Sequence, residues 1–213
     1  QLVRAGLNQN PTTIRLNVYG LATPLVSFPA GGQVNDAWGD IIEVGDDYVL
    51  ASTGFISGNG QTMFIARYSY DGVPIVVWSQ NHGGAGDEVG RSVVQTSDGG
   101  FIAVGQPDSF GPNNNFYAVK VDNFTGNLIW QNNYDFNSGN DFAFNIIRSS
   151  DNNVYMIVGY ADIYSNTTVN DNIWVIKIDD NGTPLWNKTY GGVGVDRGFS
   201  IQATPDGGYI VVG

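Results

Sequence analysis

Four carboxylates recur along the chain at a nearly constant spacing, and they are the first residues whose pattern suggests chemistry. Asp36, Glu88, Asp141 and Asp196 follow one another at intervals of 52, 53 and 55 residues. If repeated units surround an axis, these carboxylates lie at one level and form a ring suited to a hard cation such as Ca²⁺, which prefers oxygen ligands. The structural alternative is that each acid caps the turn entering the inner strand of its unit.

Basic residues recur with the same period. They are Arg15, Arg67, Lys120 and Lys177, and each stands among apolar neighbours in the middle of a strand-like segment. A charge that is buried needs a partner. We therefore expect repeated ion pairs with the recurring Asp or Glu, and a structural rather than a catalytic role.

His82 is the only histidine, and the chain has no cysteine. A lone histidine without cysteine makes neither a familiar zinc site nor a Cys–His dyad, and no nucleophile-elbow motif accompanies it. We expect His82 to lie in a solvated loop. No pair among the acidic residues stands out from the repeat as the carboxylate pair of a glycoside hydrolase.

The element that must position these residues is a repeated unit of about 53 residues. Trp78, Trp130 and Trp186 share its period. A small polar residue also recurs four positions after each acid, as Asp40, Ser92, Asn145 and Ser200. Self-similarity at a fixed long period is typical of solenoids, propellers and arrays.

Each unit holds about four short strand signals, separated by turn residues. In the second full unit we predict strands over residues 92–95, 101–105, 116–122 and 127–130, with a Gly-containing turn at 96–100. No segment keeps a helical period of 3.6 residues, so we predict almost no helix. Four strands per unit of this length are typical of a propeller blade.

We therefore predict an all-β fold: one β-propeller domain over residues 1–213, made of four four-stranded blades of about 53 residues. Residues 29–78, 79–130 and 131–186 form full blades. Residues 1–28 supply strands three and four of a split blade, and residues 187–213 supply its strands one and two. The split blade is completed either within the chain or between chains by strand addition, which also covers open sheet edges.

Two passages carry a resemblance to known repeats. The segment from Asp122 to Trp130, Asp-Asn-Phe-Thr-Gly-Asn-Leu-Ile-Trp, resembles the Asp-x-x-Thr-Gly-x-x-x-Trp signature of PQQ-like propeller repeats. Residues 98–105 and 206–213, of the type Asp-Gly-Gly-Tyr-Ile-Val-Val-Gly, resemble repeats of secreted or cell-surface propeller proteins. The resemblance implies the fold. It carries over no catalytic residue and no cofactor, because PQQ enzymes use paired cysteines and an eight-bladed ring.

The composition of the chain limits the classes of partner that it can bind. The formal net charge of −11 and the pI of about 4.1 argue against nucleic acid and anionic membranes, which both require clustered Lys and Arg. No apolar run approaches the ~20 residues that span a bilayer, so membrane insertion is not expected. The chain begins with Gln rather than Met, so it is either processed or a fragment of a longer protein, and we favour removal of a signal peptide from an extracellular or cell-surface protein.

Four Asn-x-Ser/Thr triplets are candidate glycosylation sites, at Asn123, Asn166, Asn181 and Asn187. Asn166, in a polar stretch, is the strongest candidate, and Asn181 is the weakest because Pro184 follows its Thr. In an Asn-rich chain such triplets also arise by chance.

The sequence thus predicts a non-enzymatic, extracellular structural or adhesive module, with a filament or surface-layer subunit as one version. Its partners are further copies of itself or other surface proteins and glycans, and no cofactor is expected beyond Ca²⁺ at the acid ring. The alternative is a glycan- or ligand-binding propeller that uses the polar loops at residues 106–115 and 161–172. A PQQ-like oxidoreductase or a glycoside hydrolase is less favoured.

Overall fold

The structure is a computed structural model that describes residues 12–13, 26–27, 39–56, 60–70, 74–84, 86–107, 114–137, 139–163 and 170–213. Every regular element in these ranges is a β-strand, as predicted. No helix long and apolar enough to cross a bilayer occurs among the described residues.

Three four-stranded sheets make up most of the fold. The first sheet contains β3 (Asp40–Val44), β4 (Asp47–Ile56), β5 (Gly60–Tyr70) and β6 (Pro74–His82). The second contains β7 (Val89–Gln95), β8 (Phe101–Gln106), β9 (Phe116–Val121) and β10 (Leu128–Tyr134), and the third β11 (Asp141–Arg148), β12 (Val154–Asp162), β13 (Asp171–Asp179) and β14 (Pro184–Tyr190). Strands are paired antiparallel in chain order, which confirms the predicted four-stranded unit.

Two shorter pairs flank these sheets. β1 (Thr12–Thr13) pairs with β2 (Val26–Ser27), and β15 (Ser200–Ala203) pairs with β16 (Tyr209–Val212). Within the described residues neither pair is bonded to the other, so the predicted joining of the chain ends into one blade stays a prediction. The fourth strand of each full sheet continues past the tryptophan at which the predicted blade ends, to His82, Tyr134 and Tyr190.

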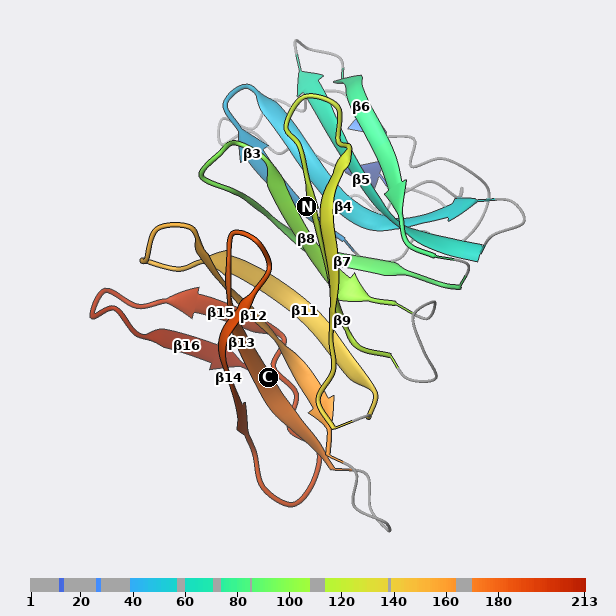
Figure 1. Cartoon of the computed structure of the whole chain (residues 1–213). Helices are drawn as coiled ribbons and strands as arrows, with labels where there is room; N and C mark the ends of the chain where they lie inside the picture. The colour runs from blue at the N-terminus through green and yellow to red at the C-terminus, as the bar shows by residue number, and fades with distance from the viewer. Residues whose placement is uncertain are drawn as a thin grey trace, which may run out of the picture.

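The sheets pack face to face in chain order (Figure 1). The first strand of each unit makes the contact: β7 lies against β3, β4 and β5, β11 against β7, β8 and β9, and β15 against β11 and β12. Each core is therefore a layer between consecutive sheets. One layer contains Met63 and Phe101, and the next contains Phe116 and Trp174.

The second sheet is buried on both faces because it has a neighbour on each side. Phe101 and Ala103 of β8 belong to the layer shared with the first sheet, while Ile102 and Val104 belong to the layer shared with the third. Every residue of β9 is buried. This explains why β8 begins with four consecutive apolar residues, from Phe101 to Val104, rather than with an alternation of apolar and polar residues.

The PQQ-like motif is the turn between β9 and β10. Both carboxylate oxygens of Asp122 accept hydrogen bonds, from the backbone N–H groups of Phe124, Thr125 and Asn127, each at 2.8 Å, and from the Thr125 hydroxyl. Gly126 has a φ of 70°, which favours glycine. The Asp, Thr and Gly of the motif therefore fix the conformation of one turn, which is a structural role.

Candidate functional site

The recurring basic residues and tryptophans are cross-strand partners. Arg67 pairs with Trp78, Lys120 with Trp130, and Lys177 with Trp186, and in each sheet the strand register shifts directly beside this pair. Directly opposed residues project from the same face of a sheet. We call each pair, together with the turns that it contacts, an inter-sheet clamp.

The first clamp joins the first sheet to the β9–β10 turn of the second. The Arg67 guanidinium pairs with Asp47 of its own sheet at 2.7 Å, and its Nη1 donates to the side-chain oxygen and the carbonyl of Asn123 at 2.5 and 3.2 Å. The Trp78 indole N–H donates to the same carbonyl at 2.9 Å. Two side chains of one sheet thus hold one turn of the next.

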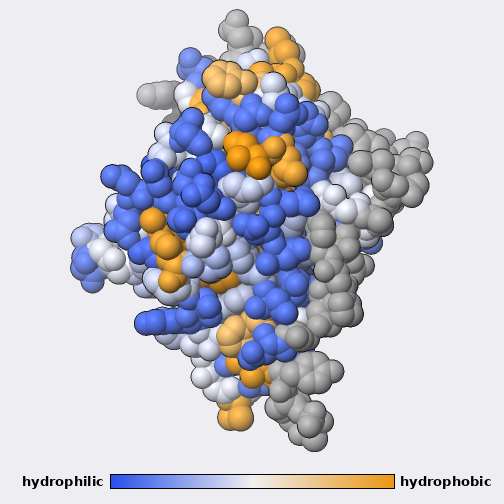
Figure 2. Space-filling model, in the orientation of Figure 1, coloured by the Kyte–Doolittle hydropathy of each residue, from blue (hydrophilic) through white to orange (hydrophobic). Residues whose placement is uncertain are grey.

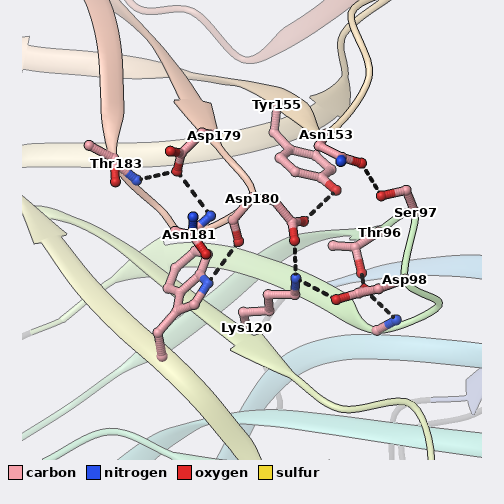
Figure 3. Close-up of polar contacts among 12 residues, drawn as sticks. Thr96, Ser97, Asp98, Lys120, Asn153, Tyr155, Asp179, Asp180, Asn181 and Thr183 are labelled. Carbon is pink, nitrogen blue, oxygen red and sulfur yellow. Dashed lines mark hydrogen bonds and ion pairs between the residues drawn. The ribbon is translucent and has the colours of Figure 1, made fainter.

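The second clamp repeats this arrangement with an amine (Figure 3). Lys120 Nζ lies 2.7 Å from Asp98 of its own sheet and 2.6 Å from Asp180 in the β13–β14 turn of the third sheet. The Trp130 indole donates to the Asp180 carbonyl at 3.0 Å, and the Tyr155 hydroxyl donates to the Asp180 carboxylate at 3.0 Å.

The electrostatics of the second clamp follow from these contacts. Burial alone would lower the pKa of Lys120, whose side chain is 4% exposed, but the hydrogen bonds and charges of Asp180 and Asp98 outweigh it and raise that pKa. Burial likewise opposes ionisation of Asp98, yet hydrogen bonds from Lys120, Thr96 and the Gly100 N–H lower its pKa to about 2. The amine and the Asp98 carboxylate are therefore both charged at neutral pH.

A glycine in each receiving turn makes room for the tryptophan. A Cβ on Gly126 would lie 2.4 Å from Trp78 Cε3, and one on Gly182 would lie 3.1 Å from Trp130 Cη2. Both glycines also have positive φ, of 70° and 77°. At Gly126 the indole ring and the turn fit only because this position has no side chain, and at Gly182 a side chain would crowd the indole.

The third clamp has its own-sheet contact but no described receiving turn. Lys177 Nζ pairs with Asp151 at 2.5 Å, and Lys188 Nζ lies 5.8 Å from the centre of the Trp186 ring. Trp186 is 36% exposed, whereas Trp78 is 7% exposed. The repeat places the receiving turn in the split unit, between residues 19 and 24, outside the described residues.

The ion-pair prediction was right about pairing and wrong about the partner. Lys120 and Lys177 pair with acids of turns, and Arg67 pairs with Asp47 at the start of β4. None of these partners is the recurring Glu88 or Asp141. The reason is geometric, because each recurring acid lies where the first strand of its unit begins, whereas the basic residue lies at the opposite, turn end of the sheet. Arg15 lies outside the described residues.

The recurring acids contact local loops. Asp141 accepts a hydrogen bond from the Phe136 N–H at 2.7 Å, and Asp196 accepts one from the Gly192 N–H at 2.9 Å. Glu88 packs so closely under Gly83 that a Cβ there would lie 2.0 Å from its Oε2. The contacts of Asp141 and Asp196 are of the capping kind. Asp36 lies outside the described residues, and no group of three or more metal-ligating side chains occurs within them, so the calcium ring stays a prediction.

Asp141 is the most perturbed of these acids. The residue is 0% exposed, and its Oδ1 has no hydrogen-bond partner. Burial, reinforced by the charges of Asp135 and Asp162, outweighs the backbone hydrogen bonds that favour ionisation and raises its pKa to about 7. Periodicity alone found the residue but gave no sign of this burial.

A polar spine links the first strands of the units. Ser92 Oγ donates to Asp40 at 2.8 Å, Asn145 Nδ2 donates to Ser92 Oγ at 3.0 Å, and the Ile201 N–H donates to Asn145 Oδ1 at 3.1 Å. These are three of the four recurring small polar positions. The fourth, Ser200, is exposed. The sequence showed the positions, but it did not show that they bond to one another.

His82 is buried and not solvated as we expected. It ends β6, is 8% exposed, and has a pKa lowered to about 4 by burial, against the opposing effect of a hydrogen bond to the Gly126 backbone. The expected loop begins one residue later, because β6 continues to His82 itself. His82 is therefore neutral at physiological pH.

The glycosylation candidates fall in different surroundings. Asn181 and Asn187 are exposed, whereas Asn123 is half-buried and its side chain accepts from Arg67 in the first clamp. Asn166 lies outside the described residues, as do residues 108–113 and 164–169 of the two polar loops. Occupancy of the four sites and recognition by the loops stay predictions.

Comparison with known proteins extends to the fold alone. No protein-family model and no curated protein matches the chain. Among solved structures, the endo-arabinase from Bacteroides thetaiotaomicron matches with a TM-score of 0.52 and 11% identity, over 89% of this chain and 74% of that one. The chain is therefore an all-β protein of repeated four-stranded sheets with a propeller-like fold.

Proposed function

We propose that this chain is a non-enzymatic structural or adhesive module of the cell exterior, a four-bladed β-propeller whose open end is completed by strands of another copy. One observation carries the proposal: the third clamp presents Lys177 and Trp186 in the register of the inner clamps, without a described receiving turn. The chain's own split unit, supplied in trans, has the repeat position that would fill it. Such head-to-tail addition builds a filament or a surface layer when it does not close.

The surface around the third clamp supports this assignment. Exposed apolar side chains lie on β14 and β16, and these strands end the third sheet and the C-terminal pair: Leu185, Tyr190, Ile210 and Val212 are 52–58% exposed. β16 pairs only with β15 in the described part of the chain, so its outer edge can accept a strand. On the face drawn in Figure 2, apolar residues form separate small groups among hydrophilic ones.

The test is the mass of the species in solution. Static light scattering over a range of protein concentrations, with electron microscopy of the same samples, should show concentration-dependent assembly. Trp186→Ala should lower the apparent association constant of this assembly at least tenfold. Phe124→Ala removes an aromatic ring that is 82% exposed on a different turn, and serves as the matched control that assembles normally. A wild-type chain that stays monomeric at every concentration would refute assembly, and turnover abolished by a point mutation would refute the non-enzymatic role.

A glycan-binding propeller is the second candidate, and the fold shared with an endo-arabinase favours it. In this version the same sheets present a carbohydrate site rather than an assembly surface. A glycan array probed with unglycosylated protein tests it, and the absence of any bound glycan would count against it.

A further inference from the structure

The first strands of consecutive units share a β-bulge that points one side chain out of the ladder. Arg91 is left unpaired between Gly90 and Ser92, and Phe144 is left unpaired between Ala143 and Asn145. Phe199 holds the same place in the fourth unit, directly before Ser200 of the polar spine. Bulges commonly re-aim a side chain at binding and active sites.

The bulged residues come together with neighbouring aromatic rings. The ring centres of Phe144 and Phe199 are 5.0 Å apart, and Phe144 lies 5.8 Å from Tyr160, which stacks on Phe142 at 4.8 Å. The Arg91 guanidinium lies 6.0 Å from the centre of the Phe144 ring. We call this group the bulge cluster: Arg91, Phe142, Phe144, Tyr160 and Phe199.

Among the described residues Arg91 has no acidic partner, which distinguishes it from the neighbouring Arg197. Arg197 lies over Tyr160 at 4.3 Å and forms an ion pair with Asp171 at 2.5 Å. Arg91 takes part in none of the ion pairs or hydrogen bonds among the described residues, and its Nε is buried without a partner. The Arg91 side chain as a whole is half-buried. A half-buried guanidinium that lacks an acceptor is costly, and an anion would satisfy it.

The cluster also offers an apolar platform beside this charge. Phe199 is 51% exposed, while Tyr160, on the other side of the contacts made by Phe144, is 8% exposed. Burial raises the pKa of Tyr160 to about 12, so its hydroxyl stays neutral. Aromatic rings near the Arg91 guanidinium suit a ligand that has both a flat, weakly polar face and a carboxylate. A uronic acid unit combines a sugar ring, whose C–H face packs on aromatics, with a carboxylate that a guanidinium binds bidentately.

We propose that the bulge cluster binds an acidic saccharide, with the sugar ring on Phe199 and the carboxylate on Arg91. This inference rests on the second candidate function, glycan binding, and supplies its location and ligand class. Arg91 provides the charge selectivity and Phe199 provides contact area for acidic and neutral sugars alike.

Isothermal titration calorimetry with a galacturonic acid trisaccharide tests the proposal, with the linkage-matched galactose trisaccharide as the neutral probe. The protein is kept at a concentration where light scattering shows one species. Arg91→Gln should weaken binding of the acidic probe by about tenfold to a hundredfold, the range expected for a lost charge-assisted contact. Arg148→Gln removes the same charge from an exposed position on β11 and should leave binding within about twofold.

Phe199→Ala changes an exposed position, where folding tolerates substitution, and should weaken the binding of both probes. This variant keeps the test decisive if Arg91→Gln does not fold. Equal affinity for the two probes, or an unchanged affinity in folded Arg91→Gln, would overturn this inference and leave glycan binding standing. If folded wild-type protein binds neither probe and no glycan on an array, both the inference and the second candidate fail.

Discussion

The second and third clamps contain the same residue types in the same register, yet their surroundings differ. Lys120 binds acids of two sheets and its side chain is 4% exposed, whereas Lys177 binds one acid and is 18% exposed. Trp130 reaches the following turn through its indole, while Trp186 is an exposed ring. The comparison shows that each unit encodes contacts to the unit after it, and these contacts gain their full value only where that unit is present.

The largest expected effect is the difference in stability loss between removing Trp78, which contacts a receiving turn, and removing Trp186, for which no receiving turn is described. Trp78→Ala should destabilise the fold by about 3–5 kcal/mol, because it removes a ring that is 7% exposed and a hydrogen bond to the Asn123 carbonyl. Trp186→Ala should cost clearly less in the isolated chain, since this ring is 36% exposed. Urea unfolding followed by circular dichroism measures both. Equal losses would mean that the third clamp is occupied in solution.

Asp141 and Asp196 give the same comparison at the loop end of consecutive units. Asp141 is fully buried with a pKa raised to about 7, whereas Asp196 is partly exposed. Because the folded state holds a proton that the unfolded state has already lost between about pH 4 and 7, stability should fall as the pH rises through that window. Asp141→Asn should therefore stabilise the protein by on the order of 2–4 kcal/mol at pH 8 and by almost nothing at pH 4.

The measurement is urea unfolding at pH 4, 6 and 8. The side-chain oxygen of the introduced asparagine can still accept from the Phe136 N–H, so the substitution removes the charge and keeps the cap. Asp196→Asn, at the equivalent but partly exposed position of the next unit, is the matched control for the substitution itself. A gain at pH 8 no larger than that at pH 4 would contradict the buried-acid interpretation.

Periodicity was enough to predict the sheets but not the contacts between them. Strand-length apolar runs and glycine turns predicted β8 and β9 to within one residue, since these signals are local, whereas β7 begins three residues earlier and β10 ends four residues later than predicted. The shared period of tryptophan and basic residue also follows from the fold, because the two are cross-strand partners such as Lys120 and Trp130. Which acid binds the amine was not predictable, because Asp180 lies 60 residues away in sequence and is brought near only by the packing of two sheets.

The bulge cluster was missed for a similar reason. Arg91 and Phe144 lie one position before the recurring polar residues, and their differing types hide the shared position. A bulge is a matter of strand register, which depends on the partner strand as well as on the local sequence. The prediction for His82 failed in another way, because a buried residue was expected to be solvated. Nothing in its polar sequence neighbours indicated that β6 continues to it.

The smallest of these stability effects is expected when the lysines of the second and third clamps are replaced. Lys120→Met should destabilise by about 2 kcal/mol: it breaks a buried contact, but the two acids left behind, Asp98 and Asp180, are 51% and 26% exposed and partly hydrated. Lys177→Met should have a clearly smaller effect, because its partner Asp151 is 59% exposed and the pair is screened by water. Urea unfolding of both variants beside the wild type measures the two losses, and equal losses would contradict the difference between the second and third clamps.

The same pair of variants sharpens the comparison when the pH is lowered. The pKa of Asp98 is lowered in the folded state to about 2, so its contribution is present above about pH 4 and is lost as the pH falls toward 2. The difference in unfolding free energy between wild type and Lys120→Met should therefore shrink as the pH is lowered from about 4 toward 2. Urea unfolding of both proteins at several pH values in this range measures it. A difference that is independent of pH would assign the loss to packing of the lysine stem instead of to its charge.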